Sequence, residues 1–281
     1  MTRYAERRAR AIATFGAASL ASMMIAAGAA GADPASGPPG GGEGWSGSVG
    51  IGAGAAPDYE GSDDYTVIPL PNFELSRGGY GVKTNRLGLE ADLTPSRSFN
   101  AGPILRYQFG RDDDVEDSRV SRLDEVDPSI ELGGFVSYAI PNLTGTGDVA
   151  VLRLSAVQDV ADGHGGFVAE ASAGYVRPVT ERLSAGAFLG ATYASEDYMD
   201  AFFGVSAAEA ARSGLSASDA DGGLKDVGVT VVLDYALTDS WSLNGVAGYK
   251  RLLGDAADSA VTDEAGSPDQ AFGGLGFSYD F

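Results

Sequence analysis

The sequence has no cysteine, a single histidine and few basic residues. Without cysteine the chain has no disulfide framework, no thiolate nucleophile and no Cys-ligated zinc site. One histidine, His164, excludes a metal centre built from several histidines. The chain has 19 Lys and Arg against 39 Asp and Glu, a net charge of −20, whereas nucleic-acid binding needs clustered basic side chains. We therefore expect no cofactor and no nucleic-acid partner.

Glycine, by contrast, is abundant, and the chain is apolar enough to fold. It has 41 glycines in 281 residues, about twice the usual share of ~7%. Glycine at this level disfavours long helices. Hydrophobic residues make up 44% of the chain, which is too many for a disordered acidic protein. The composition therefore favours a folded protein with few helices.

The N-terminus predicts an export signal. Residues 1–10 carry four Arg, and residues 11–32 are uncharged and end in Ala-Gly-Ala. A basic start, an apolar stretch and a small-x-small site are typical of a secretory signal peptide, here cleaved after Ala32. An uncleaved membrane anchor is the alternative. The Gly- and Pro-rich residues 33–44 then predict a flexible tether, and residues 45–281 form the remaining domain.

From Trp45 onward, apolar side chains recur at every second position. Clear runs lie at 99–109, 130–140, 150–156, 167–175, 183–193, 227–237, 241–251 and 271–281. Period two predicts β-strands, and about ten residues is the length of a tilted strand that crosses a bilayer. The opposite face of these runs is rich in Gly, Ser, Ala and Asn, which suits the lumen of a barrel.

Two further features favour a transmembrane barrel over a soluble sandwich. Aromatic residues lie near the strand ends, as membrane-interface girdles require. Short and long connections alternate, as in outer-membrane barrels, which have short periplasmic turns and long external loops. The acidic segments 57–65, 111–127, 196–223 and 254–269 together hold 23 acids and four bases, so the strands are almost neutral. We expect an all-β, antiparallel transmembrane β-barrel in the outer membrane of a Gram-negative bacterium.

The number of strands depends on the N-terminal part of this domain. Counting back from Phe281 gives eight strands as far as residue 97, and segments 45–56, 66–76 and 79–93 add three. Bacterial barrels have an even number of strands. Splitting 79–93 into two strands gives twelve, which we expect, and omitting one segment gives ten, the alternative.

Opposite charges on the inward face predict ion pairs across neighbouring strands. If the hairpin 147–177 turns near residue 162, Arg153 lies opposite Glu170. Similar counting places Asp226 near Lys250, and Arg106 near Glu131. Such pairs indicate a packed or narrow lumen more than a wide solute pore.

The segment GIGAGAAPDYEGSDDYTVIPLPNFEL at 50–75 is a distinctive sequence block, and further blocks stand at 107–114, 198–217, 241–259 and 273–281. These blocks, the first most specifically, resemble the MltA-interacting protein (MipA/OmpV) family of outer-membrane proteins. The resemblance implies a non-enzymatic scaffold that binds a lytic transglycosylase and links it to a murein synthase, with no catalytic residues. A passage barrel for small solutes or antibiotics, or an adhesin, is the alternative. The alternating C-terminal residues Phe277, Tyr279 and Phe281 also resemble the signal read by the barrel assembly machinery.

Candidate sites are few. His164, near Asp159 and Asp162, would be a general base if this were an outer-membrane hydrolase, but a solvated histidine in a glycine-rich external turn is the simpler interpretation. Four carboxylates at 58–64 are candidate ligands for Ca²⁺ or Mg²⁺, or bridges to lipopolysaccharide phosphates: Asp58, Glu60, Asp63 and Asp64. A structured acidic turn with Tyr59 and Tyr65 at the membrane interface is the alternative.

The long segment 196–223 contains apolar residues followed by the helix-prone sequence AAEAAR. Phe202 and Phe203 belong to this apolar part. Either a short amphipathic helix folds over or into the barrel mouth, or these aromatics form an exposed surface for a partner.

Overall fold

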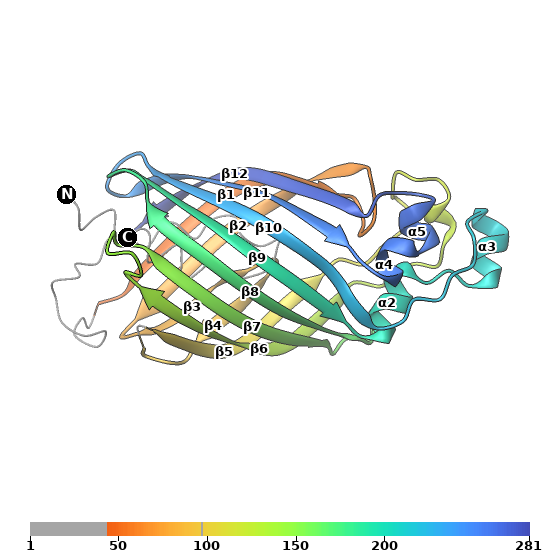
Figure 1. Ribbon diagram of the computed structural model, residues 1–281, viewed down its shortest axis with the longest axis horizontal. Coiled ribbons are helices and arrows are strands. Elements are labelled where there is room, and N and C mark those ends of the chain that lie inside the picture. The colour runs from red at the N-terminus through yellow and green to blue at the C-terminus, as the bar shows by residue number, and fades with distance from the viewer. Residues whose placement is uncertain (1–43, 97) are drawn as a thin grey trace.

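The computed structural model describes residues 44–96 and 98–281, so the predicted signal peptide and nearly all of the tether lie outside it. Twelve antiparallel strands form a closed barrel in which β1 pairs with both β2 and β12 (Figure 1). The strands are β1 Ser46–Pro57, β2 Tyr65–Arg77, β3 Tyr80–Asn85, β4 Gly88–Asp92, β5 Phe99–Gln108, β6 Ser129–Pro141, β7 Val149–Asp159, β8 Phe167–Pro178, β9 Leu183–Ala194, β10 Gly223–Ala236, β11 Trp241–Leu252 and β12 Asp269–Asp280. The prediction of twelve strands is confirmed.

The predicted division of segment 79–93 is also confirmed. β3 and β4 are only six and five residues long and are joined by the two residues Arg86 and Leu87. Arg86 has a positive φ of 52°, a backbone conformation that is uncommon for a residue other than glycine. This hairpin is therefore much shorter than the strand pairs around it.

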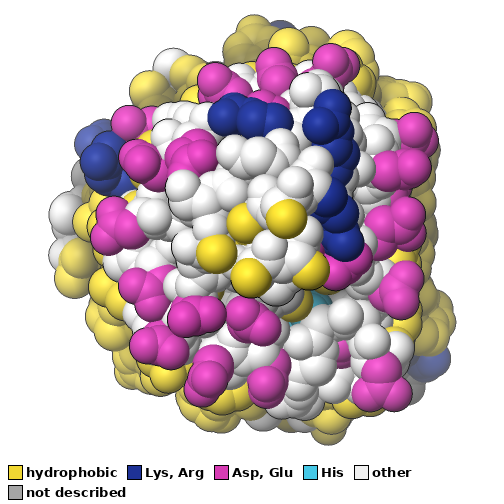
Figure 2. All heavy atoms as spheres, turned by 90° about the vertical axis from the view of Figure 1, so that its right-hand side faces the viewer, with side chains coloured by type: hydrophobic (Ala, Val, Ile, Leu, Met, Phe, Trp, Pro, Cys, Tyr) yellow, Lys and Arg dark blue, Asp and Glu magenta, His cyan; other side chains and the backbone are white. Residues whose placement is uncertain are grey.

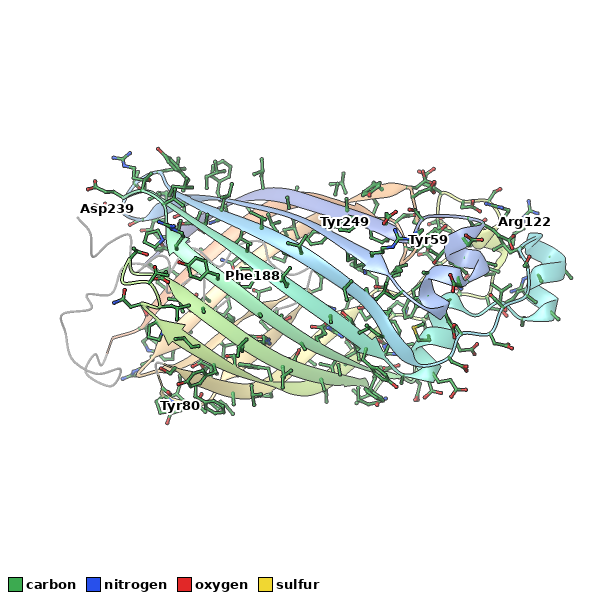
Figure 3. The ribbon with its side chains drawn as sticks, in the orientation of Figure 1. Tyr59, Tyr80, Arg122, Phe188, Asp239 and Tyr249 are labelled. Carbon is green, nitrogen blue, oxygen red and sulfur yellow. The ribbon has the colours of Figure 1, made fainter. Side chains whose placement is uncertain are left out.

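Side chains alternate between the two faces of the wall, as the period of two predicts. In β12, Leu275 and Phe277 point outward and are 63% and 52% exposed, whereas Gln270 and Ser278 point inward and are buried. Outward aromatics lie at both ends of the strands; Figure 3 places Tyr80 at one end and Tyr249 toward the other. The outer surface is thus apolar with aromatic ends, as a lipid-facing wall requires.

The connections at the two ends differ in length. The start of β1, the C-terminal Phe281, the end of β4 and the turns 78–79, 142–148, 179–182 and 237–240 lie at one end, which we call the turn end. The segments 58–64, 109–128, 160–166, 195–222 and 253–268 lie at the other, the loop end, where Asp and Glu side chains are dense (Figure 2). The described residues contain no helix that is long and apolar enough to span a membrane.

Short helices in the loops form a cap over the barrel (Figure 1). They are η1 Val120–Arg122, α2 Glu196–Phe203, α3 Ala207–Ser213, α4 Asp255–Asp258 and α5 Ala260–Asp263. The helix-prone AAEAAR forms α3, and the apolar residues before it form a second helix, α2, where the sequence predicted only one helix. The side chain of Ser206 and the side chain of Glu209 form a capping box at the start of α3, and Gly214, with a φ of 83°, ends it.

One apolar cluster attaches the cap to the barrel, and a second joins the loops of the cap to one another. Met199, Phe202 and Phe203 of α2 pack against inward residues of the strands, among them Phe135 and Val157. Tyr59, Val120, Leu123, Val205, Leu215, Ala260, Val261 and Ala265 form the second cluster, between the loops themselves. Burial of these side chains holds the cap in place.

The alternative of an exposed partner surface at Phe202 and Phe203 is wrong. Phe202 is 4% exposed and Phe203 is fully buried. The physical reason is that α2 turns its apolar face into the barrel mouth, where that face is removed from water.

Candidate functional site in the barrel lumen

Glu60 lies at the centre of the loop-end lumen. It is carried there by the β1–β2 loop, and its carboxylate accepts hydrogen bonds from Lys225 Nζ at 2.6 Å and Lys250 Nζ at 2.7 Å. The hydroxyl of Tyr198, on α2, donates to the same carboxylate at 2.9 Å. Burial alone would raise the pKa of Glu60, but the two lysines hold it well below its usual range. Glu60 therefore stays ionised and joins three separate parts of the chain.

Tyr198 extends this centre toward the histidine. Its ring meets the ring of His164 edge-on, with centroids 4.8 Å apart, and Lys225 Nζ lies 5.0 Å from the centroid of the Tyr198 ring. Burial, together with the negative charges of Glu60 and Glu131, raises the pKa of the Tyr198 hydroxyl well above its usual value. The phenol consequently remains a neutral donor to Glu60.

His164 is buried, so the expectation of a solvated histidine is wrong. Its Nδ1 accepts the N–H of Gly166 at 3.1 Å, which leaves the proton on Nε2, and Nε2 lies 3.2 Å from Glu131 Oε1. Asp159 accepts the backbone N–H of His164 at 2.8 Å and does not bind the ring. Because both ring nitrogens are engaged, neither is available to activate a nucleophile.

A second group of charges continues from Glu131 down the lumen. Glu131 binds Arg106, as predicted, and Arg106 NH1 lies 3.3 Å from Glu170, which also binds Arg86 from the β3–β4 turn. Arg86 has a positive φ, which is a strained backbone conformation for this residue type. This conformation of the turn places the Arg86 guanidinium against Glu170. These side chains belong to four different strands or turns and fill the space between them.

A third group of charges surrounds Glu90 of β4. Lys83 and Arg153 lie 2.8 Å and 2.7 Å from this carboxylate, and Asn85 also donates to it. The guanidinium of Arg153 lies 4.2 Å from the centroid of Phe135. We refer to the charges around Glu60, Glu131, Glu170 and Glu90 together as the charged plug.

Two predicted ion pairs have the wrong partners. Arg153 lies opposite Ser172 instead of Glu170, and Lys250 lies opposite Gly228 instead of Asp226. Each register is shifted by two residues from the prediction, because the turns are not centred where simple counting puts them. The long basic side chains instead reach across the lumen, Arg153 to Glu90 and Lys250 to Glu60, and Asp226 accepts from Thr192 at 2.9 Å.

The acidic turn does not gather its carboxylates into a cation site. Glu60 points inward to its lysines, Asp58 accepts the N–H of Glu116 at 3.1 Å, and Asp63 and Asp64 are exposed. Across residues 44–96 and 98–281, no three acidic or histidine side chains converge as a metal ion would need. The candidate ligands are therefore wrong as a set.

The two tyrosines of this turn are placed differently from each other. Tyr59 is buried in the cap and donates its hydroxyl to the carbonyl of Ala265 at 2.7 Å, and burial raises its pKa to about 12. Tyr65 is 49% exposed on the outer surface, at the start of β2, where a membrane-interface residue is expected.

Four residues of the charged plug were not predicted from the sequence: Lys83, Glu90, Tyr198 and Lys225. Lys83 and Glu90 nevertheless occupy inward positions of the period-two pattern.

The fold and the charged plug define an outer-membrane β-barrel whose lumen is packed with paired charges from its loop end to the level of the β3–β4 hairpin. The chain belongs to the MltA-interacting protein MipA family, whose family model matches residues 49–281. It is 28% identical over 218 residues to the "Putative outer membrane protein YiaT" of Escherichia coli K12. The aligned region covers 76% of this chain and 84% of that protein.

Solved structures with similar folds are also outer-membrane barrels. OmpT of Vibrio cholerae has a TM-score of 0.35 and 8% identity, covering 85% of this chain and 97% of that chain. OprB of Pseudomonas putida has a TM-score of 0.38 and 10% identity, covering 85% of this chain and 94% of that chain. At these values the resemblance concerns the barrel fold alone.

Proposed function

We propose that this chain is a non-enzymatic scaffold that holds a murein hydrolase, a lytic transglycosylase of the MltA kind, at the outer membrane beside a murein synthase. The name of the family supports such a partner. Lipid and lipopolysaccharide surround the wall, and the C-terminal residues Phe277, Tyr279 and Phe281 serve the barrel assembly machinery. Both assignments are part of the same proposal.

The charged plug is the observation that supports this function best. Glu90, Glu131, Arg106 and Arg153 are each at most 4% exposed, although all four point into the lumen. Side chains that are paired and buried to this degree leave little room for a hydrated solute in the part of the lumen that they occupy. A barrel of this kind is better suited to binding through its outer surfaces than to conduction.

The turn end is the surface that we assign to the murein enzyme. Short turns face the periplasm in outer-membrane barrels, and murein lies on that side. Four apolar side chains at this end are 41–58% exposed: Leu93, Leu143, Val179 and Leu237. Exposed apolar residues that cluster at one end are typical of protein contacts.

A binding experiment tests this assignment. The purified barrel, embedded in nanodiscs, is mixed with an MltA-type lytic transglycosylase, and the retained enzyme is measured. The double substitution Leu143→Ser, Val179→Ser is expected to lower retention, whereas Ala208→Ser, Ala211→Ser in α3, at the loop end, is expected to leave it unchanged. Equal retention by both variants, or no retention by the unchanged barrel, would contradict the proposal.

Conductance decides between this function and the passage of small solutes. A barrel with a charged plug is expected to give no steady open-pore current in planar bilayers at neutral pH. Currents of open-pore size from the unchanged protein would favour the passage barrel instead. The two experiments are independent, since a conducting barrel could still retain the enzyme.

A further inference from the structure

The barrel wall is interrupted beside β2. Residues Glu74–Arg77 of β2 pair with β3, but among the described strands Tyr65–Asn72 pair with β1 alone. The β3–β4 hairpin ends at Arg86 and Leu87, and the N–H of Tyr107 in β5 reaches the carbonyl of Leu87 at 3.4 Å. Above this hairpin, β2 and β5 are not paired with each other. We call this interruption the β2 gap.

The β2 gap has a roof at the loop end. The loop 109–128 leaves β5 and crosses toward the β1–β2 loop, where the N–H of Glu116 donates to Asp58 at 3.1 Å. Arg119, from the same loop, donates to the carbonyl of Glu264 at 2.6 Å. The gap is therefore a window in the wall, closed above by the loop and below by the hairpin, and not an open slit.

Two prolines adapt the edge of β2 to this gap. The N–H of Phe73 points toward β3, because it donates to Thr84 Oγ1 at 2.9 Å. Backbone groups of a strand alternate in direction, so Pro69 and Pro71 face the same side as Phe73, into the gap. Proline has no N–H, and its presence on a free edge blocks pairing with another strand. The edge therefore disfavours a β-strand of a partner protein as the occupant of the gap.

The inner surface behind the gap is apolar and accessible. Ile68 and Leu70 point inward and lie opposite Gly54 and Gly52 of β1, and all four are partly exposed. On β12, the inward residues Phe272 and Gly274 are also partly exposed. We call this surface, formed by Gly52, Gly54, Ile68, Leu70, Phe272 and Gly274, the apolar recess.

The outer side of the gap is continuous with the lipid-facing wall. Val67, one residue before Ile68, is 76% exposed, and Leu89 and Leu105 on the hairpin and β5 are 44% and 45% exposed. Tyr65 lies above these residues and Tyr80 below them, so the gap falls within the apolar belt between the aromatic ends. What lies outside the gap in the membrane is therefore hydrocarbon.

From this arrangement we infer that the β2 gap admits an acyl chain of a bilayer lipid into the apolar recess. The acyl chain leaves one hydrocarbon environment for another, but it removes the partly exposed apolar surface of Ile68, Leu70 and Phe272 from lumen water, which is favourable in proportion to the area covered. The carbonyl oxygens of Val67, Pro69 and Pro71 also face the gap, so lumen water or a donor group of the lipid must satisfy them. The site binds lipid and does not depend on the scaffold function.

Fluorescence quenching tests this inference, and the absence of cysteine makes the labelling specific. Three single-cysteine variants are labelled with bimane and placed in vesicles of phosphatidylcholine with brominated acyl chains, which quench on contact. Ile68→Cys reports the recess. Val67→Cys is the outward control, and Ser155→Cys is the control on the inward face of β7, beside the charged plug.

We expect brominated chains to quench the emission at positions 67 and 68 and to leave position 155 unquenched. Adding Leu70→Asp to Ile68→Cys is expected to reduce the quenching at position 68, and gel migration before and after heating checks that each variant is folded. Emission at position 68 that stays unquenched while position 67 is quenched would overturn the inference. So would quenching at position 68 by added brominated free fatty acid but not by brominated phospholipid, because the source would then not be the bilayer lipid.

Discussion

The hydroxyl of Tyr198 donates to the carboxylate of Glu60 over 2.9 Å, and this bond connects the cap to the barrel. Tyr198 belongs to α2, whereas Lys225 and Lys250, which bind the same carboxylate, belong to β10 and β11. One carboxylate thus joins the β1–β2 loop to a cap helix and to two strands of the wall. The stability of the loop end should therefore depend on Glu60 more than on any other acid of that turn.

Replacing Glu60 by Gln should destabilise the barrel by about 3–5 kcal/mol. Lys250 would lose its counter-charge and Lys225 would keep only Asp226, 3.4 Å away, and leaving a buried charge unpaired costs this much. Urea unfolding in detergent, followed by the fluorescence of Trp45 and Trp241, measures the change. Asp63→Asn is the matched control, because Asp63 is exposed on the same turn and should shift the midpoint little. Equal effects of the two substitutions would contradict the assigned role.

The low pKa of Glu60 also predicts how stability depends on pH. Because this pKa is depressed in the folded protein, the carboxylate contributes stability that is present above the unfolded value of about 4.3. That contribution is lost as the pH falls through the lower, folded pKa. The unchanged barrel should lose stability below about pH 4, and Glu60→Gln should show a flatter dependence in the same range. Parallel pH profiles for both proteins would show that other acids dominate.

Substitution of His164 should affect stability and not hydrolysis. His164→Gln would disturb the contacts with Gly166, Glu131 and the ring of Tyr198, at an expected cost of about 1–3 kcal/mol. Since both ring nitrogens are engaged in structural bonds, the unchanged protein and the variant should be equally inactive on lipid and peptide substrates. Hydrolysis by the unchanged barrel that disappears in His164→Gln would instead make this residue catalytic.

Much of the wall was predictable from the sequence because strand pairing in a barrel is mainly between neighbours in the chain. Period two gave the inward and outward faces, and the pair Arg106–Glu131 followed from the hairpin that joins β5 and β6. An even number of strands left two possibilities, the division of 79–93 or the omission of one segment, and β3 and β4 confirm the division. Local pattern and chain connectivity were sufficient for these features.

The charged plug was not predictable in the same way. Glu60 and Lys225 are 165 residues apart, and Arg153 meets Glu90 across the lumen instead of along a hairpin. Period two says that a side chain points inward, but it does not say which strand faces it across a closed ring. The burial of Phe202 and Phe203 likewise depends on where the loop folds, and the pattern of residues within the loop left that open.

The contact between Gly174 and Phe188 offers a test of packing at the other half of the lumen. The two residues face each other on β8 and β9, and a Cβ atom at position 174 would lie 1.9 Å from the Phe188 ring. Phe188, labelled in Figure 3, is 4% exposed and packs with Val176 and Val232, so that its ring has little room to move. Gly174→Ala should therefore destabilise the barrel by about 1–3 kcal/mol through overpacking.

Three further variants separate this overpacking from the general effect of adding a methyl group to a strand glycine. Gly190→Ala, on the neighbouring strand β9, is the matched control, because its nearest neighbouring atom is 3.7 Å from the added Cβ and the substitution should be nearly neutral. Phe188→Ala removes the ring. In that background, adding Gly174→Ala should lower the free energy of unfolding much less than it does in the unchanged protein, so the two substitutions should be non-additive. Urea unfolding of the four proteins measures the coupling. If the two substitutions were additive, Gly174 would be required for its backbone and not for the aromatic ring that covers it.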